Sequence, residues 1–410
     1  MRKILLATTA VAAAAVFGPA PVAAQEAPTV RVGGYFRFNY SFTDQDLSSG
    51  VNNGVSTGKS DFASDTEVHV IVAGKAANGL TYGATVELQV DMSNNSNSAS
   101  DNLAAQSKTG VDTDEMYMWV ATPQLGQLRM GDEDGVLGGL MNSGHITNFG
   151  TGGMDGDWFD SVIGAPRATT MHPGDIGDNT KIIYMSPQFF GFDFGGSFAF
   201  NTGEGEDVGC AGTLPNASCD RFTSGPGALR RRNEYQVAAR YRGSFSGVGM
   251  SITGGYIGSE VAKNTTGLSG DNISVGVVGA QFTAYGLLVG GWYNWGSSNG
   301  GWNPLAKGQV DGRDMTSWFA GASYTFSGLT IGANTYDLRT AGSQSVAAGR
   351  VDRGWSVGAS YALAPGLALV AEYNQVRRKE NGFNFATGAA GTDNNAVDAN
   401  IVIVGTRIAF

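Results

Sequence analysis

Beyond its first 24 residues, the 410-residue sequence contains no long apolar run. A helix that crosses a bilayer needs about 20 consecutive apolar residues. The rest of the chain is therefore not expected to form membrane helices, and an inner-membrane helical bundle is excluded. A membrane β-barrel is not excluded, because its strands alternate apolar with polar residues and the two kinds average out to a near-neutral hydropathy.

Cysteine is nearly absent: the chain has only Cys210 and Cys219, in a stretch rich in Gly, Pro and Asn. A metal site would need further ligands, and no His lies close by in the sequence. Two cysteines in one loop of an exported protein favour a local disulfide. A disulfide between Cys210 and Cys219 is therefore predicted, with a metal site as the alternative.

Positive charge is in short supply. There are 26 Lys and Arg against 36 Asp and Glu, which gives a net charge of −10. Loss of the N-terminal segment with Arg2 and Lys3 would change −10 to −12. This acidity argues against nucleic acid as a partner. It favours cations over anions only weakly, since salt screens charges that lie far from an aqueous path.

Residues 1–24 are typical of a secretory signal peptide. Two basic residues precede the apolar stretch 4–17, and residues 22–24 supply the small side chains at a cleavage site. A first membrane helix is the alternative, but the apolar stretch is short and soon interrupted by Gly and Pro. We expect removal of this segment and a single β-barrel domain over residues 25–410.

Glycine is present in excess: 62 of 410 residues, against a usual share of about 7%. No collagen-like triplet period accounts for it. Glycine inside a strand permits bends and close packing, and glycine in a turn supplies a positive φ. Both uses fit a curved sheet that closes on itself.

Seven short turns end in glycine, and each is flanked by strand-like segments. Their glycines are Gly79, Gly126, Gly191, Gly247, Gly286, Gly328 and Gly366. Together with a first strand near 30–42 and a last strand near 397–410, seven hairpins predict sixteen strands. In the first strand, Val32, Phe36 and Phe38 share one face, and the opposite face is polar.

Long polar segments alternate with the short turns. They cover residues 43–63, 92–111, 133–178, 202–231, 260–271, 297–312, 340–350 and 380–396. Short turns on one side and long loops on the other are the asymmetry of outer-membrane barrels. An even strand number near sixteen leaves an aqueous channel. The chain also ends as such barrels do, with Phe410 closing an alternating strand.

In these features the chain resembles the Gram-negative general porins, in particular the alphaproteobacterial type. The resemblance is carried by the N-terminal segment, the opening strand 30–37, the segment 117–134 and the terminal segment 401–410. It implies an all-β, sixteen-stranded transmembrane barrel that forms homotrimers and passes ions and small hydrophilic solutes by diffusion. It also implies that loop 133–178 folds into the lumen, and that the barrel-assembly machinery recognises Phe410.

The resemblance further implies a constriction between an acidic loop and a basic wall, whose transverse field would orient polar solutes. The candidate loop residues are Asp132, Glu133, Asp134, Asp155, Asp157 and Asp160. The candidate wall residues, from strand alternation, are Arg37, Arg129, Arg240, Arg242, Arg339 and Arg378. Mild cation selectivity is expected.

Other ligands and functions stay open at this stage. The two acidic stretches 132–134 and 155–157 have oxygen ligands suited to a structural Ca²⁺, or they form a solvated acidic face; no other cofactor is expected. Residues 230–232 are three arginines that could bind lipopolysaccharide phosphate or line the mouth.

Alternatives to general diffusion are a substrate-specific channel with lumenal aromatics (Trp292, Trp295, Trp302), an adhesin or structural barrel, and a Ser/His enzyme. Only His69, His145 and His172 could serve that enzyme, and no G-x-S-x-G motif is present, so we do not predict an enzyme.

Overall fold

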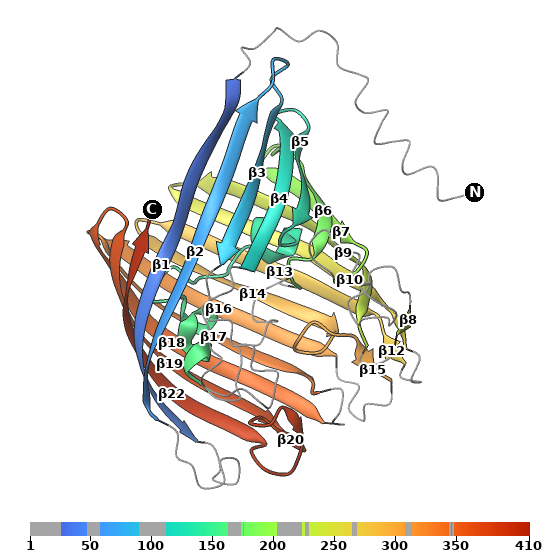
Figure 1. Cartoon of the computed structure of the whole chain (residues 1–410), viewed down its shortest axis with the longest axis vertical. Coiled ribbons are helices and arrows are strands. Elements are labelled where there is room, and N and C mark those ends of the chain that lie inside the picture. The colour runs from blue at the N-terminus through green and yellow to red at the C-terminus, as the bar shows by residue number, and fades with distance from the viewer. Residues whose placement is uncertain are drawn as a thin grey trace.

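The computed structural model describes residues 26–46, 58–89, 112–162, 174, 176–202, 224–225, 229–264, 269–307, 314–343, 346 and 348–410. Sixteen antiparallel strands form one closed barrel (Figure 1). The strands are β1 (Glu26–Asp46), β2 (Ser60–Lys75), β3 (Thr81–Gln89), β4 (Asp112–Thr122), β5 (Gly126–Asp132), β6 (Thr180–Met185), β7 (Phe192–Ala199), β9 (Arg231–Phe245), β10 (Val248–Val261), β13 (Ile273–Ala284), β14 (Leu287–Ser297), β16 (Met315–Phe326), β17 (Leu329–Ala341), β18 (Gly349–Ala364), β19 (Leu367–Glu380) and β22 (Ala396–Ala409).

Smaller elements lie in the long connections. Three two-stranded pairs are β8 (Ser224–Gly225) with β11 (Lys263–Asn264), β12 (Gly270–Asp271) with β15 (Leu305–Ala306), and β20 (Phe383–Asn384) with β21 (Ala389–Ala390). A π-helical turn, η3 (Val136–Leu140), and two 3₁₀ turns, η4 (Gly153–Asp155) and η5 (Asp157–Ser161), follow β5. Among the described residues, no helix combines the length and apolar character needed to cross a membrane.

The predicted hairpin turns are confirmed. All seven predicted glycines have a positive φ, between 76° and 91°. In four of these turns the residue before the glycine is also left-handed, with φ of 48° to 50° at Phe190, Ser246, Tyr285 and Ser327. Two consecutive residues of positive φ match the right-handed twist of the flanking strands, which is why such turns connect hairpins.

The first and last strands close the ring, as predicted. Tyr35 pairs with Ala409 and Phe42 with Val402 across β1 and β22, and β1 pairs with β2 on its other side. Phe410 exchanges two backbone hydrogen bonds of 3.1 Å with Gly34. No barrel strand is left with an unpaired edge, which satisfies the backbone groups that would otherwise face lipid.

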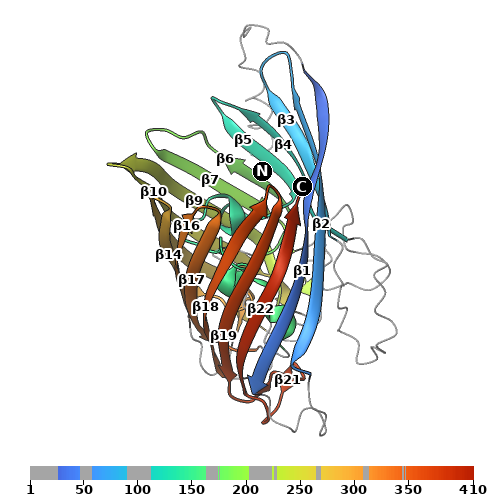
Figure 2. The same cartoon turned by 90° about the vertical axis from the view of Figure 1, so that its left-hand side faces the viewer.

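The two faces of the barrel wall differ as the strand alternation predicts. On β1, Phe36, Phe38 and Phe42 point outward and are 41–42% exposed, whereas Asn39 and Ser41 point inward and are buried. The same outward apolar pattern recurs on the later strands. Figure 2 shows the side of the barrel where β22 lies next to β1. An apolar outer band is the surface that a bilayer covers.

The hydrophobic core lies inside the barrel and not between layers of secondary structure. It joins loop residues after β5, such as Leu137 and Trp158, to inward residues of the wall, such as Val275 and Ile401. Sequence alternation predicted a lumen with polar and charged walls. The observed wall also carries apolar residues on its inner face. They are there because an inserted loop covers part of this face, and the apolar side chains of the loop need apolar partners.

Several sequence predictions lie outside the described residues. These are the signal peptide at residues 1–24, the Cys210–Cys219 disulfide, and His172, one of the three histidines considered for an enzyme.

Candidate functional site

The third long loop lies inside the ring of strands, where its helical turns are visible in Figure 1. Residues 133–162, called the belt below, follow the inner wall in the order of the strands. Successive belt residues form hydrogen bonds with successive strands. Examples in chain order are those of Leu137 with Gln236 of β9, Met141 with Thr253 of β10, Gly144 with Gln281 of β13, His145 with Trp292 of β14, Asn148 with Ser323 of β16, Gly150 with Ser360 of β18, and Thr151 with Glu372 of β19.

The belt lies in a shallow groove made by glycines of the wall. A Cβ on Gly279 would lie 2.1 Å from the Ser143 carbonyl oxygen, and one on Gly332 would lie 2.2 Å from Phe149 Cδ1. Only glycine permits such close approach. The inward glycines whose Cβ would meet the belt, called the glycine track below, are Gly195, Gly255, Gly279, Gly290, Gly321, Gly332, Gly354 and Gly358.

Apolar side chains hold the belt against the wall. Val136, Leu137 and Met154 are completely buried, and Trp158 is 1% exposed. Full burial of such side chains stabilises by about 1.5–3 kcal/mol each relative to exposure. The belt is therefore packed as a core element, and its position is fixed by more than its charges.

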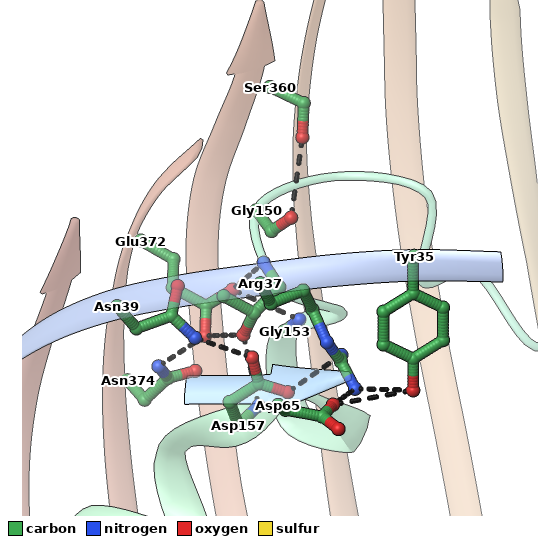
Figure 3. A network of polar contacts seen from close by, with 11 residues as sticks. Tyr35, Arg37, Asn39, Asp65, Gly150, Gly153, Asp157, Ser360, Glu372 and Asn374 are labelled. Atoms are coloured by element: carbon green, nitrogen blue, oxygen red, sulfur yellow. Dashed lines mark hydrogen bonds and ion pairs between the residues drawn. The ribbon is translucent and has the colours of Figure 1, made fainter. Parts of the chain in front are cut away.

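Two buried polar side chains of the wall bind the backbone of the belt. Glu372 of β19 accepts hydrogen bonds from Thr151 N–H at 2.8 Å, Thr151 Oγ1 at 2.7 Å and Gly153 N–H at 3.2 Å (Figure 3). Asn334 of β17 accepts from Met154 N–H at 3.0 Å. These bonds satisfy belt groups that have no partner in regular secondary structure.

The far end of the belt reaches the first strand. Arg37 Nη1 donates to Asp157 Oδ1 at 3.0 Å, and Asn39 Nδ2 donates to Asp157 Oδ2 at 2.7 Å. Arg37 also forms an ion pair with Asp65 of β2, and its Nη2 donates a hydrogen bond to the Tyr35 hydroxyl at 3.0 Å (Figure 3). The belt thus begins at β5 and closes on β1, after passing along the wall between them.

The predicted acidic residues take different positions. Asp132 accepts a hydrogen bond from Thr180, and Glu133 pairs with Arg129 at 2.6 Å. Asp155 pairs with His145 at 2.7 Å and Asp157 with Arg37. Asp134 packs against Gly138 in the turn η3, and Asp160 is exposed on η5.

Within the part of the chain that the structure describes, two of the predicted basic residues form ion pairs with predicted acidic ones, namely Arg37 and Arg129. Arg240 and Arg242 both pair with Asp193 of β7, at 2.7 and 2.8 Å. Arg378 pairs with Asp352 of the neighbouring strand at 2.8 Å. Arg37 and Arg129 thus pair with carboxylates of the loop, whereas Arg240, Arg242 and Arg378 pair with carboxylates of neighbouring strands.

The prediction that Arg339 faces the lumen is wrong. Its side chain is 63% exposed and pairs with Asp337, two residues earlier on the same face of β17. The intervening Leu338 is the buried, inward residue. The prediction from alternation failed by one position, and a shift of one residue moves a side chain to the other face of a strand.

One group of side chains has the spacing of metal ligands among the described residues. Ligand atoms of Glu67, His69 and Glu87, on β2 and β3, lie within 4.8 Å of one another. His69 Nε2 is already 2.6 Å from Glu67 Oε1, and Nδ1 is 3.6 Å from Glu87 Oε1. The hydrogen bond between His69 and Glu67 already engages one ligand atom of each without a metal. In the two acidic stretches considered for Ca²⁺ or a solvated face, Asp132, Glu133, Asp155 and Asp157 contact protein side chains.

Burial has the largest effect on the pKa of Glu133, the first residue of the belt. Removal from water raises the pKa of Glu133, and the adjacent Arg129 guanidinium and Lys181 ammonium oppose this effect. The Lys181 ammonium also donates to the Glu133 carbonyl oxygen. The start of the belt is thus held by charge-assisted bonds in a poorly solvated place.

The comparisons with known proteins agree with this geometry. The sequence profile of the Gram-negative porin family matches residues 7–381. The chain belongs to this family. Solved structures with the same fold include mutants of the Rhodopseudomonas blastica porin: one with five substitutions (14% identity, TM-score 0.52) and one with three substitutions (15% identity, TM-score 0.52). Each alignment covers 93% of this chain and 100% of the other. No protein of curated function matches this porin in sequence.

Sequence reasoning missed the wall residues that hold this porin's belt. Glu372 and Asn334 were not singled out, because a polar residue at an inward position is expected on every porin strand. The glycine track did leave a signal, since its members occupy inward positions of seven barrel strands, namely β7, β10, β13, β14, β16, β17 and β18. The composition indicated close packing but could not identify which segment packs there.

Proposed function

We propose that this porin is a general diffusion channel of the outer membrane, which passes ions and small hydrophilic solutes and is narrowed by the belt. The observation that supports it best is a closed sixteen-stranded barrel with an apolar outer band and a loop fixed along its inner wall. A barrel of this size leaves room for water. A rigid inserted loop sets the width of the remaining path without a moving part.

Mild cation selectivity is part of the proposal. On the inner face of β1 to β5 the two arginines are compensated: Arg37 by Asp65 and Asp157, and Arg129 by Glu133. In this group three carboxylates face two arginines. A wall with an excess of carboxylates lowers the potential along the path and attracts cations.

A substrate-specific channel has less support from the aromatic side chains. Trp292 and Trp302 are only 4% and 1% exposed, so they are covered. Trp295 is 46% exposed and, by alternation with buried Asn294, faces outward. None of the three forms an open aromatic track along the lumen. An adhesin would use the same barrel, and a test of conductance separates the two functions.

We further propose three partners that follow from the family: two more copies of the chain in a homotrimer, lipopolysaccharide around the barrel, and the barrel-assembly machinery. For the last, Phe410 is the candidate signal, since its side chain is 62% exposed at the end of β22. Native mass spectrometry of the detergent-extracted protein tests the trimer. A stable monomer that conducts would contradict it.

The decisive experiment is single-channel recording of the refolded protein in a planar bilayer, without added substrate. We expect conductance steps in groups of three and little block by any one sugar. In a KCl gradient, the sign of the reversal potential should show that K⁺ passes more readily than Cl⁻. Small steps that one class of solute saturates would support the substrate-specific alternative. Absence of conductance by protein with full β-structure would overturn the channel.

A further inference from the structure

A row of charged side chains crosses the outer face of the barrel at the ends of four neighbouring strands. Asp337 of β17 pairs in register with Arg353 of β18, which pairs with Arg377 of β19, which pairs with Asp398 of β22. Alternation shows that the row faces outward, because Asp352, next to Arg353, is buried and points inward. The outward Arg339 lies beside this row.

The row lies at the border of the apolar band. From Arg353 toward the short turn, the outward residues of β18 are Trp355, Val357, Ala359, Tyr361 and Leu363, and the four larger ones among them are 44–50% exposed. In the other direction the strand ends in a long loop. Charged side chains are costly within hydrocarbon but suited to the headgroup level beside interfacial tryptophans.

A depression of about 320 Å³ lies over this row. Its lining combines the two arginines and the two carboxylates of the row with the aromatic rings of Trp318 and Trp355. Such a lining offers guanidinium donors together with the flat apolar surfaces of two indole rings. It fits an amphipathic molecule with an anionic group better than it fits a free ion.

The charges of the row are only partly compensated. Arg339 Nε pairs with Asp337 at 3.0 Å, and Arg377 Nε is 3.9 Å from Asp398, with both side chains of this second pair about half exposed. Arg353 lies between these pairs, and it has no ion pair with any residue that the structure describes. On the other side of Asp398, its partner on β1 is Asp46. The arginines of this region, Arg339, Arg353 and Arg377, therefore lie on β17, β18 and β19.

We propose that Arg353 and Arg377 bind a phosphate group of an anionic membrane lipid, whose apolar part packs on Trp355 and Trp318. Guanidinium groups bind phosphate oxygens through paired hydrogen bonds. The register places the two arginines as direct neighbours across β18 and β19, so one phosphate can receive donors from both. This site rests on the proposed outer-membrane location, and it specifies where the lipid partner is held.

Binding is tested on the folded wild-type protein in neutral detergent by native mass spectrometry. The probes are a bisphosphorylated lipid A, the same lipid after enzymatic removal of its phosphates, and inorganic phosphate as competitor. We expect at least tenfold weaker binding of the dephosphorylated lipid and no competition by millimolar phosphate. Equal binding of both lipids overturns the site, and displacement by inorganic phosphate overturns its assignment to a lipid.

Variants locate the site. Arg353→Gln and Arg377→Gln should each weaken binding of the phosphorylated lipid about tenfold. The matched control Arg242→Gln makes the same change of net charge on the inner face, where Arg242 pairs with Asp193, and should leave binding unchanged. Equal loss in all three variants would show attraction to net charge only and overturn the site. A changed oligomeric state in Arg353→Gln, without loss of lipid, would overturn it too and show instead that the row contacts a second copy.

The outcome can be separated from that of the proposed function. Conductance of Arg353→Gln in a bilayer of neutral lipid should equal that of the wild type, since the side chain lies outside the lumen. Conducting protein without a lipid preference overturns only the site. Protein that prefers the phosphorylated lipid in detergent but does not conduct overturns only the channel.

Discussion

Trp292 Nε1 donates a hydrogen bond to His145 Nδ1 at 3.2 Å, and this bond decides the tautomer of the histidine. Since the indole nitrogen is only a donor, Nδ1 must accept, and the ring proton is on Nε2. Nε2 then donates to Asp155 at 2.7 Å. One imidazole thereby links the wall strand β14 to two positions of the belt that are ten residues apart in sequence. It therefore contributes to holding the belt against the wall.

The first prediction separates the two bonds of this histidine. Trp292→Phe keeps an aromatic ring parallel to Phe319, which lies 6.0 Å away at an interplanar angle of 3°, but it leaves His145 Nδ1 without a donor. We expect a loss of about 1–3 kcal/mol in the free energy of unfolding. His145→Ala removes both bonds and the ring contact, so its loss should be larger. Denaturant unfolding in detergent measures both, and a Trp292→Phe variant as stable as the wild type would contradict the role of the indole bond.

The second prediction concerns the glycine track. Gly279→Ala places a Cβ 2.1 Å from the backbone oxygen of Ser143, so the belt or the strand must move. Overpacking of this kind typically costs about 1–3 kcal/mol. The matched control is Gly254→Ala, where a Cβ would meet nothing within 4 Å. We expect altered single-channel conductance and lower stability for Gly279→Ala only; unchanged conductance would mean that the belt does not narrow the path.

The third prediction concerns the carboxylate that holds the belt. Glu372→Gln keeps the size of the side chain but turns one acceptor oxygen into an NH₂ group that faces the donors of Thr151 and Gly153. Loss of a satisfied buried acceptor costs about 1–3 kcal/mol. Hydrogen exchange should accelerate at the Thr151 and Gly153 amides and stay unchanged in the hairpin turn at Gly328. Equal acceleration throughout the barrel would indicate general destabilisation instead.

The barrel could be predicted from the sequence because its determinants are local. Turn glycines such as Gly247 and Gly286 fix where hairpins form, and alternation in strands such as β1 fixes which face is apolar. Both signals need only a few neighbouring residues. The strand number and the closure of β1 on β22 follow once every turn is located.

The arrangement inside the barrel could not be predicted in the same way. Contacts such as Thr151 with Glu372 join residues 221 positions apart, and no local pattern encodes that pairing. Charge signs alone suggested an acidic loop opposite basic walls, whereas Arg240 and Arg378 pair with acids of neighbouring strands. Arg339 shows the remaining weakness, because near a strand end alternation alone assigned the wrong face.

The last prediction tests the contact at which the belt closes on β1. Arg37 and Asp157 are partly buried and 3.0 Å apart, so each carries a charge close to the proposed path. Asp157→Asn removes a negative charge and should reduce the preference for cations, whereas Arg37→Gln removes a positive charge and should increase it. Reversal potentials in a KCl gradient should therefore shift in opposite directions.

The double variant completes this test. If the pair acts mainly through its field, Arg37→Gln combined with Asp157→Asn should return the reversal potential close to the wild-type value, because the two charge changes cancel. If the pair instead acts by holding the belt, both single variants should shift conductance in the same direction, and the double variant should not recover. The free energy of unfolding should be measured for the same three variants. Effects of substitutions at residues in contact are commonly non-additive by about 0.5–3 kcal/mol. Non-additivity of this size would show that the Arg37–Asp157 contact also holds the belt in place.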